Sequence, residues 1–119
     1  MSYSSFEELE VWKRASNLAV KIYGIMKQSR DFGLRDQMTR AAISIASNIA
    51  EGAERDSKAE FIRFLHIAKG SAAELRTQIY IANQVKIMDD SLSDELIEEL
   101  KVISKQLHSL VKYLKKPKS

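Results

Sequence analysis

The chain has 119 residues, of which 45% are hydrophobic, with one proline, four glycines and no cysteine. This length suits one domain, the scarcity of proline and glycine favours helix over loop-rich or collagen-like structure, and the lack of cysteine excludes disulfides and thiolate metal sites. A net charge of +3 is only mildly basic, so it allows nucleic-acid contact without requiring it.

The sequence shows no pattern that is typical of a secretory signal or a membrane-spanning segment. The first residues show no basic segment followed by an apolar run, and no apolar stretch approaches about 18 residues. We therefore expect no secretory signal, no membrane contact and a cytoplasmic protein.

The first predicted helix covers residues 5–27. Its main apolar row recurs at steps of three and four and consists of Trp12, Ala15, Ala19, Ile22 and Met26. Val11 and Leu18 fall beside that row. Acidic residues come first in this helix and basic residues follow, which is the order that the helix dipole favours.

The second predicted helix covers residues 34–51. Its apolar row consists of Leu34, Met38, Ala41, Ile45 and Ile49. Small residues beside the row would let another helix approach closely; they are Ala42, Ala46 and Ala50. We expect Gly52 to end this helix in a left-handed conformation.

The third predicted helix, residues 57–86, is the longest, at roughly 45 Å. Its apolar row consists of Phe61, Leu65, Ala68, Ala72, Leu75, Ile79 and Ala82. Ser57 and Glu60 form a capping-box pattern, in which each side chain bonds a backbone N–H near the other residue. A helix of this length needs comparably long partners to cover its apolar side.

The fourth predicted helix covers residues 93–114, with an apolar row of Leu96, Leu100, Ile103, Leu107, Leu110 and Leu114. Acids concentrate in residues 89–99 and lysines in residues 101–118. Because the first helix has the same polarity, an antiparallel pairing of these two helices brings opposite charges together. The sequence therefore predicts an all-α, antiparallel up-down-up-down four-helix bundle that forms one domain over residues 1–119.

The third helix carries more apolar surface than one bundle needs. A second row runs beside the first and consists of Phe64, Ile67, Ser71, Glu74 and Gln78. A surface helix of a monomer usually has a single apolar stripe, so we expect a homo-oligomer with a second buried surface. The alternative is that these are ordinary scattered surface residues.

Polar residues of the second helix also recur with helical spacing. The row consists of Gln37, Arg40, Ser44, Asn48 and Glu51. Beside the third-helix residues Glu60, Ser71 and Glu74, this row predicts a hydrogen-bonded network at an interface. A pair between Arg40 and a carboxylate would be its strongest element. The alternative is a polar ligand site.

No enzymatic motif is present. The two histidines, His66 and His108, are preceded three positions earlier by Arg63 and Lys105, so the Glu-x-x-His pattern of di-iron bundles is missing. The chain also lacks the glycine-rich loops that bind nucleotides and any recognisable triad. We expect no catalytic residue, no cofactor and no metal.

The candidate nucleic-acid surface is a basic stripe on the fourth helix. It consists of Lys101, Lys105, His108, Lys112 and Lys115, and it is extended by Lys116 and Lys118. Such a stripe could follow a phosphate backbone, with an affinity that falls as salt rises. The alternative is a solvated face that complements the helix dipole.

Two strings carry a family resemblance. The first consists of Ser44, Ile45, Asn48, Ile49, Ala50, Glu51 and Gly52. The second consists of Ala68, Gly70, Ser71, Glu74 and Leu75. Together with residues 6–15 they resemble the four-helix bundle family encoded in intervening sequences of bacterial 23S ribosomal RNA genes. Two departures are a shorter, proline-free loop at residues 28–33 and a turn at residues 85–89 without glycine.

The resemblance implies a ring, typically of five subunits. One relative, the accessory variability protein of diversity-generating retroelements, works with a reverse transcriptase and nucleic acid. Two hypotheses follow for this chain. In the first, a non-enzymatic oligomer binds RNA or a ribonucleoprotein through its basic stripe. In the second, the chain is a protein-interaction scaffold, such as a reverse-transcriptase accessory protein, without direct nucleic-acid contact.

Overall fold

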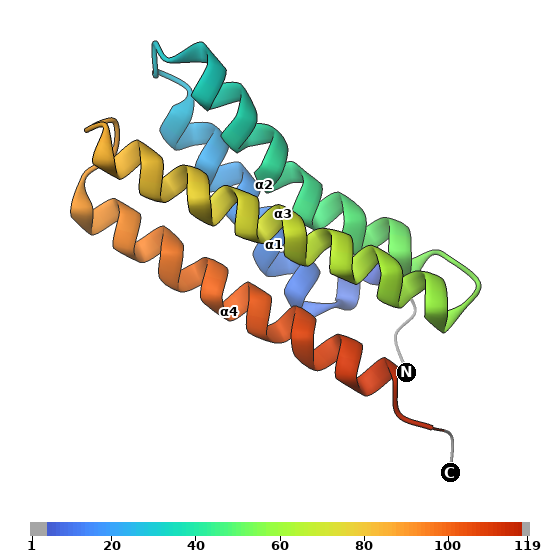
Figure 1. Cartoon of the computed structure of the whole chain (residues 1–119). Coiled ribbons are helices and arrows are strands. Elements are labelled where there is room, and N and C mark those ends of the chain that lie inside the picture. The colour runs from blue at the N-terminus through green and yellow to red at the C-terminus, as the bar shows by residue number, and fades with distance from the viewer. Residues whose placement is uncertain (1–4, 118–119) are drawn as a thin grey trace.

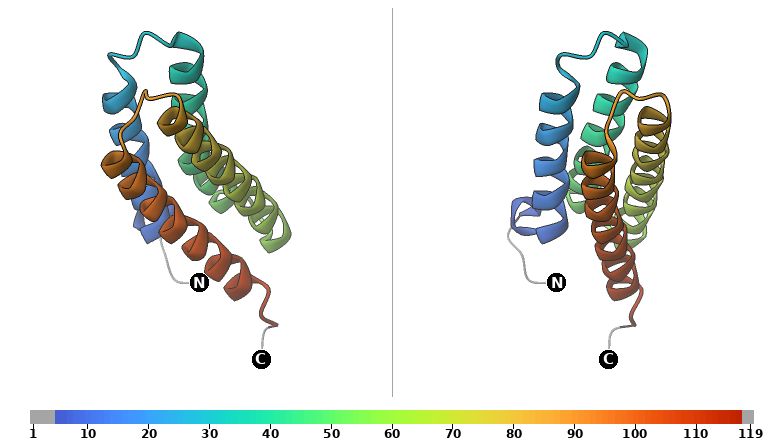
Figure 2. Two further views of the ribbon diagram at one scale, coloured as in Figure 1. Left: turned by 60° about the vertical axis from the view of Figure 1, so that its left-hand side comes forward. Right: turned by 90° about the vertical axis from the view of Figure 1, so that its left-hand side faces the viewer.

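The computed structural model describes residues 5–117, and within that range it contains four long α-helices and no strand. A short 3-10 turn, η1, precedes the helices, whose bounds are α1 Glu10–Met26, α2 Phe32–Ala53, α3 Lys58–Gln84 and α4 Asp90–Leu114; η1 itself covers Phe6–Glu8. The helices lie side by side in an elongated bundle of 52 × 19 × 19 Å (Figures 1 and 2). The predicted all-α four-helix fold is confirmed.

Contacts between α2 and α3 show the relative direction of these two helices. Ser44 and Gly52 of α2 meet Ser71 and Phe64 of α3 respectively, so residue numbers rise along one helix as they fall along the other. These two helices are therefore antiparallel, as Figure 1 also shows.

The predicted charge pairing between the first and fourth helices is present where the acids at the start of α4 meet basic residues of α1. Arg14 donates two hydrogen bonds to Glu99, at 3.0 and 2.8 Å, and Lys21 pairs with Glu95. The hydrogen bond from Arg14 to Glu99 raises the pKa of the guanidinium above its ordinary value. Because the residue numbers run in opposite directions, α1 and α4 are antiparallel as expected.

The core face of α1 differs from the predicted row. It consists of Val11, Ala15, Leu18, Ile22 and Met26. Trp12 and Ala19 are only partly buried at its edge. The face is rotated because α1 packs against both α2 and α4, which places Val11 and Leu18 between them. These two residues are core residues and not part of an apolar surplus.

Phe64 also belongs to the interior and not to a second exposed surface. Its side chain is buried, and the guanidinium groups of Arg55 and Arg63 lie 4.8 and 4.6 Å from the centre of its ring. Gln78 of the same row is buried as well, whereas Ile67 is 40% exposed. The apolar surplus of α3 is therefore smaller than the sequence predicted.

The prediction that Gly52 ends the second helix was wrong. The helix continues through Gly52 to Ala53, and no glycine among the described residues has a positive φ. Instead Gly52 is buried where α2 crosses α3, and a Cβ added to it would lie 2.6 Å from the Cβ of Phe64. The glycine permits close helix packing.

Aspartate and serine side chains begin the later helices. The Ser57 hydroxyl accepts a hydrogen bond from the Glu60 N–H at 3.1 Å, as the capping pattern predicted. The Glu60 carboxylate instead accepts from Arg63, which lowers the pKa of Glu60. Asp31 and Asp89 cap α2 and α4, which is why both helices start earlier than predicted.

The turn after α3 is closed without glycine by Lys86, whose φ is 67°. The N–H of Ile87 bonds the carbonyl of Ala82 at 2.9 Å and the N–H of Lys86 bonds that of Asn83 at 3.1 Å, which is the Schellman pattern. We expect Lys86→Gly to raise the free energy of unfolding by about 1 kcal/mol, because glycine adopts this conformation without steric cost. Urea denaturation measures it; a loss of stability would contradict the prediction.

Candidate nucleic-acid interface

The basic stripe of α4 is exposed throughout its described part. Lys101, Lys105, His108, Lys112, Lys115 and Lys116 are all exposed, and Lys118 lies outside the described residues. The stripe occupies the flank of α4 away from Glu95 and Glu99, which bind α1. Lys101 lies 3.5 Å from Glu98, and the other four lysines have no ion pair among residues 5–117.

A second basic row, which was not among the predicted site residues, lies on α3. It consists of Lys58, His66, Lys69 and Arg76, which recur with helical spacing. The row follows the flank of α3 opposite to Ser71, which faces α2, and on the side of Asn83, which bonds Asp90 of α4. The only two acids of α3, Glu60 and Glu74, fall on the other flank.

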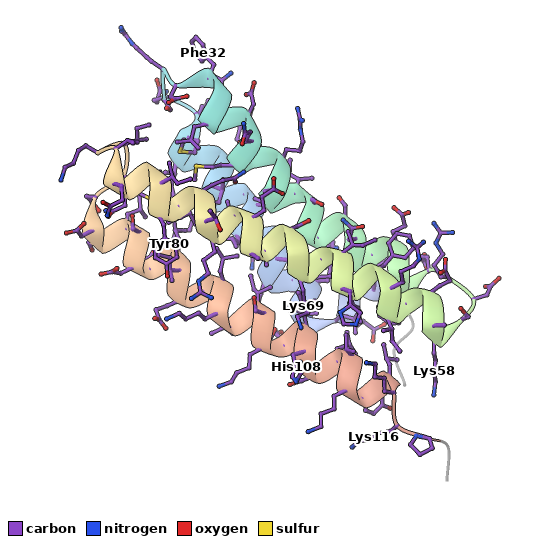
Figure 3. All side chains as sticks on the ribbon, in the orientation of Figure 1. Phe32, Lys58, Lys69, Tyr80, His108 and Lys116 are labelled. Atoms are coloured by element: carbon purple, nitrogen blue, oxygen red, sulfur yellow. The ribbon has the colours of Figure 1, made fainter. Side chains whose placement is uncertain are left out.

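The two rows form one surface, which we call the basic face. Figure 3 shows Lys58 and Lys69 of α3 on the same side of the molecule as His108 and Lys116 of α4. Packed helices lie about 8–10 Å apart, and each row extends for roughly 20–27 Å. Lys58, Lys69 and Arg76 have no ion pair within the described part of the chain. The basic face thus offers two parallel lines of basic residues, and among its described lysines and arginine Lys101 alone has an ion pair.

The chemistry of the basic face suits phosphates better than bases. The aromatic ring on this flank of α3 belongs to Tyr80, and the guanidinium of Arg76 lies 5.9 Å from its centre. Single-strand readers stack successive bases on free aromatic rings, whereas lysines neutralise phosphates without reading sequence. The side chains of the face are thus of the kind that contacts a phosphate backbone with little selection among bases.

The comparisons with known proteins decide the family. The model of the 23S rRNA-intervening sequence protein family matches residues 7–109. The chain belongs to this family. A solved structure from Bacteroides thetaiotaomicron VPI-5482, described as a protein of unknown function from the S23 ribosomal protein family, matches with a TM-score of 0.81 and 25% identity. The match covers 86% of this chain and 98% of that one. No curated protein matches the chain.

In this member of the family, the predicted polar network forms only at its centre. The Ser44 and Ser71 hydroxyls lie 2.9 Å apart, and the Asn48 amide donates to the carbonyl and hydroxyl of Ser44 at 2.8 and 2.9 Å. Five predicted members do not join it. Glu51 pairs with Arg55 and Glu60 pairs with Arg63, while the remaining three are exposed: Gln37, Arg40 and Glu74.

The described residues contain neither a candidate metal site nor a helix suited to span a membrane. Within residues 5–117, no three His, Asp or Glu side chains are grouped closely enough to hold a metal ion. His66 and His108 are both exposed on the basic face. Over the same range, no helix combines the length and apolarity that crossing a bilayer would need.

Proposed function

We propose that this family member is a non-enzymatic, cytoplasmic homo-oligomer that binds RNA or a ribonucleoprotein through its basic face. The observation that carries the proposal is the pair of cation rows on adjacent flanks of α3 and α4. Lys69 and Lys112 represent the two rows, and neither has an ion pair within residues 5–117. Unpaired surface cations gain most from a polyanion, because no internal partner has to be given up.

Self-association would strengthen binding. In a ring, which the family resemblance puts at five subunits, one basic face is repeated in every subunit. A second face then engages the same RNA at a high effective concentration, which raises the overall affinity without a new kind of contact. Exposed apolar side chains elsewhere support an assembly, because Val20 is 73% and Ile43 is 49% exposed.

A second candidate is a protein-interaction scaffold, such as a reverse-transcriptase accessory protein that does not touch nucleic acid. The exposed apolar residues Val20, Tyr23 and Ile43 favour it, because they lie on helices that do not carry the basic face. In this alternative the cations serve solubility alone.

Salt-dependent RNA binding separates the two candidates. Fluorescence anisotropy would follow a labelled RNA hairpin, a single strand of the same length and a DNA duplex between ~50 and ~200 mM salt. If five cations contact duplex phosphates, the slope of log K against log salt is about −4.5. We expect the hairpin to bind at least as well as the single strand, since stacking contributes little. No binding to any of the three at ~50 mM salt would exclude the RNA-binding function.

A further inference from the structure

A long hollow follows the outer side of α1 and α2, the two helices that do not carry the basic face. One part has a volume of about 570 Å³ and the next about 290 Å³, and Ile43 lines both. We call the continuous hollow the trough; the residues that define it are Trp12, Ala19, Tyr23, Arg40, Ile43 and Ala46. Ala19 and Ala46 in its lining are small, so the backbone of a neighbouring helix could approach closely there.

The trough combines exposed apolar residues with free cations. Tyr23 is 58% and Ile43 is 49% exposed, which is unusual for large apolar side chains that lie next to each other. In the part of the trough that Tyr23 lines, Lys27 and Arg40 have no ion pair among the described residues. An occupant of the trough should therefore be apolar along its length and should carry a carboxylate.

The outward side of α3 has these properties. Ile67 and Ile81 are 40% and 48% exposed, and Glu74 lies between them at seven-residue spacing. Glu74 is exposed and has no ion pair within residues 5–117. We call this side the ridge, defined by Ile67, Gly70, Glu74 and Ile81. It is distinct from the flank of α3 that carries the basic row.

Gly70 also indicates that another molecule contacts the ridge. It is exposed in the interior of a long helix, and a Cβ added there would meet nothing within 4 Å. Glycine is less favourable than alanine in a helix interior, so a packing reason usually lies behind it. Inside one chain Gly52 has such a reason, whereas Gly70 and Gly24 have none. A neighbouring molecule that approaches the α3 backbone closely would supply one.

We infer that the ridge of one copy of this chain docks in the trough of a second copy. The lengths match, since Ile67 to Ile81 and Trp12 to Lys27 each span about 21–23 Å of helix. Glu74 of one copy would reach Arg40 of the other near the middle of both surfaces. Gly70 would face the small residues of the trough. The inference deepens the proposed function by assigning the surfaces of its oligomer.

This geometry has a consequence for assembly. The two surfaces are different patches of one chain, so the contact is heterologous and each copy offers a free ridge and a free trough. Copies would continue to add until a ring closes or a filament grows. The basic face takes no part in the contact and would stay accessible in every subunit.

Complementation between two variants tests the docking. We expect Ile43→Asp, which disables the trough, and Ile67→Asp, which disables the ridge, each to give a monomer of 13.5 kDa by light scattering. Mixed in equal amounts they should form a dimer of twice that mass, because one intact trough meets one intact ridge. Val102→Asp is the matched control, since Val102 is 36% exposed on α4 and should leave the oligomer intact.

A charge exchange tests the register. Arg40→Glu and Glu74→Arg should each weaken association by at least tenfold in dissociation constant, and the double variant should recover most of the loss. Circular dichroism melts of all variants show that the bundle remains folded. Both positions are exposed and unpaired within one chain, so their exchange leaves the folded monomer unchanged.

Several results would overturn the inference. They are a monomeric natural chain, oligomeric Ile43→Asp or Ile67→Asp variants, or a mixture of the two that stays monomeric. RNA binding gives a separate readout, because the basic face is intact in both monomeric variants. If the dimer forms but no variant binds RNA, the docking stands and the proposed RNA function fails. If Ile43→Asp loses RNA and the mixture stays monomeric, the trough binds RNA and not a second copy.

Discussion

Replacing Gly52 by alanine is expected to lower the free energy of unfolding by about 2 kcal/mol, although alanine is the better helix former. The added Cβ would lie 2.6 Å from the Cβ of Phe64 and 3.3 Å from the carbonyl oxygen of Phe61. Neither atom can move by a change of rotamer, since one is fixed to the backbone and the other is part of it. The two helices would have to separate where they pack most closely.

Gly24→Ala is the matched control for that substitution. Gly24 also lies inside a helix, but a Cβ there would meet nothing within 4 Å. We expect this variant to be more stable than the natural chain by about 0.5–1 kcal/mol, through helix propensity alone. Urea denaturation at one fixed protein concentration measures both variants, because association also contributes to apparent stability. Equal shifts in the two variants would contradict the close approach at Gly52.

The same glycine shows where sequence reasoning reached its limit. A glycine after an apolar row is typical of a helix end, and the local pattern around Gly52 fits that interpretation. The deciding contact is with Phe64, on a different helix, and no local pattern specifies which residue will lie opposite. A cap formed by side chains close in sequence can be predicted locally, although the helices capped by Asp31 and Asp89 begin earlier than predicted. Ser57 caps its helix as expected because the cap and its partner lie three residues apart.

Apolar periodicity predicted the four helices and most of the core, since a long stripe has only one way to be buried. It was less reliable on α1, where two adjacent rows are both apolar. Whether Leu18 or Ala19 faces the core depends on the angle at which α2 and α4 flank the helix. That angle is a property of the assembled bundle. Periodicity therefore predicted the helix and three of its five core residues, but it placed Trp12 and Ala19 where the core has Val11 and Leu18.

Of the two rows of the basic face, the sequence predicted the one on α4 but not the one on α3. The α4 lysines stood out because no acid interrupts them, whereas the α3 cations are spread through a helix dominated by its apolar row. A usable signal was present in the sequence. Lys58, Lys69 and Arg76 share one flank of α3 and the helix lacks an acid on that flank. Since consecutive antiparallel helices are neighbours, that flank had an even chance of facing the α4 stripe.

Reversing one charge in each row is expected to have the largest effect on function. The variant Lys69→Glu/Lys112→Glu should bind the RNA hairpin on the order of 100-fold more weakly at low salt, because two phosphate contacts are lost and two repulsions replace them. The salt slope should become shallower by about two. Anisotropy titrations at several salt concentrations measure both quantities. Lys112 is exposed, Lys69 is half-buried and neither has an ion pair within residues 5–117, so the melting temperature should change little.

A variant with the same change in net charge separates the basic face from general attraction. Lys13→Glu/Lys86→Glu reverses two lysines that are exposed outside the basic face. Long-range attraction depends on total charge and is screened beyond about 10 Å at 0.1 M salt, so this control should lose only a few-fold in affinity. An equal loss in both variants would mean that net charge alone attracts RNA. If neither variant loses affinity for RNA, the binding surface lies elsewhere on the molecule. The next charges to reverse would then be Lys27 and Arg40, the free cations of the trough.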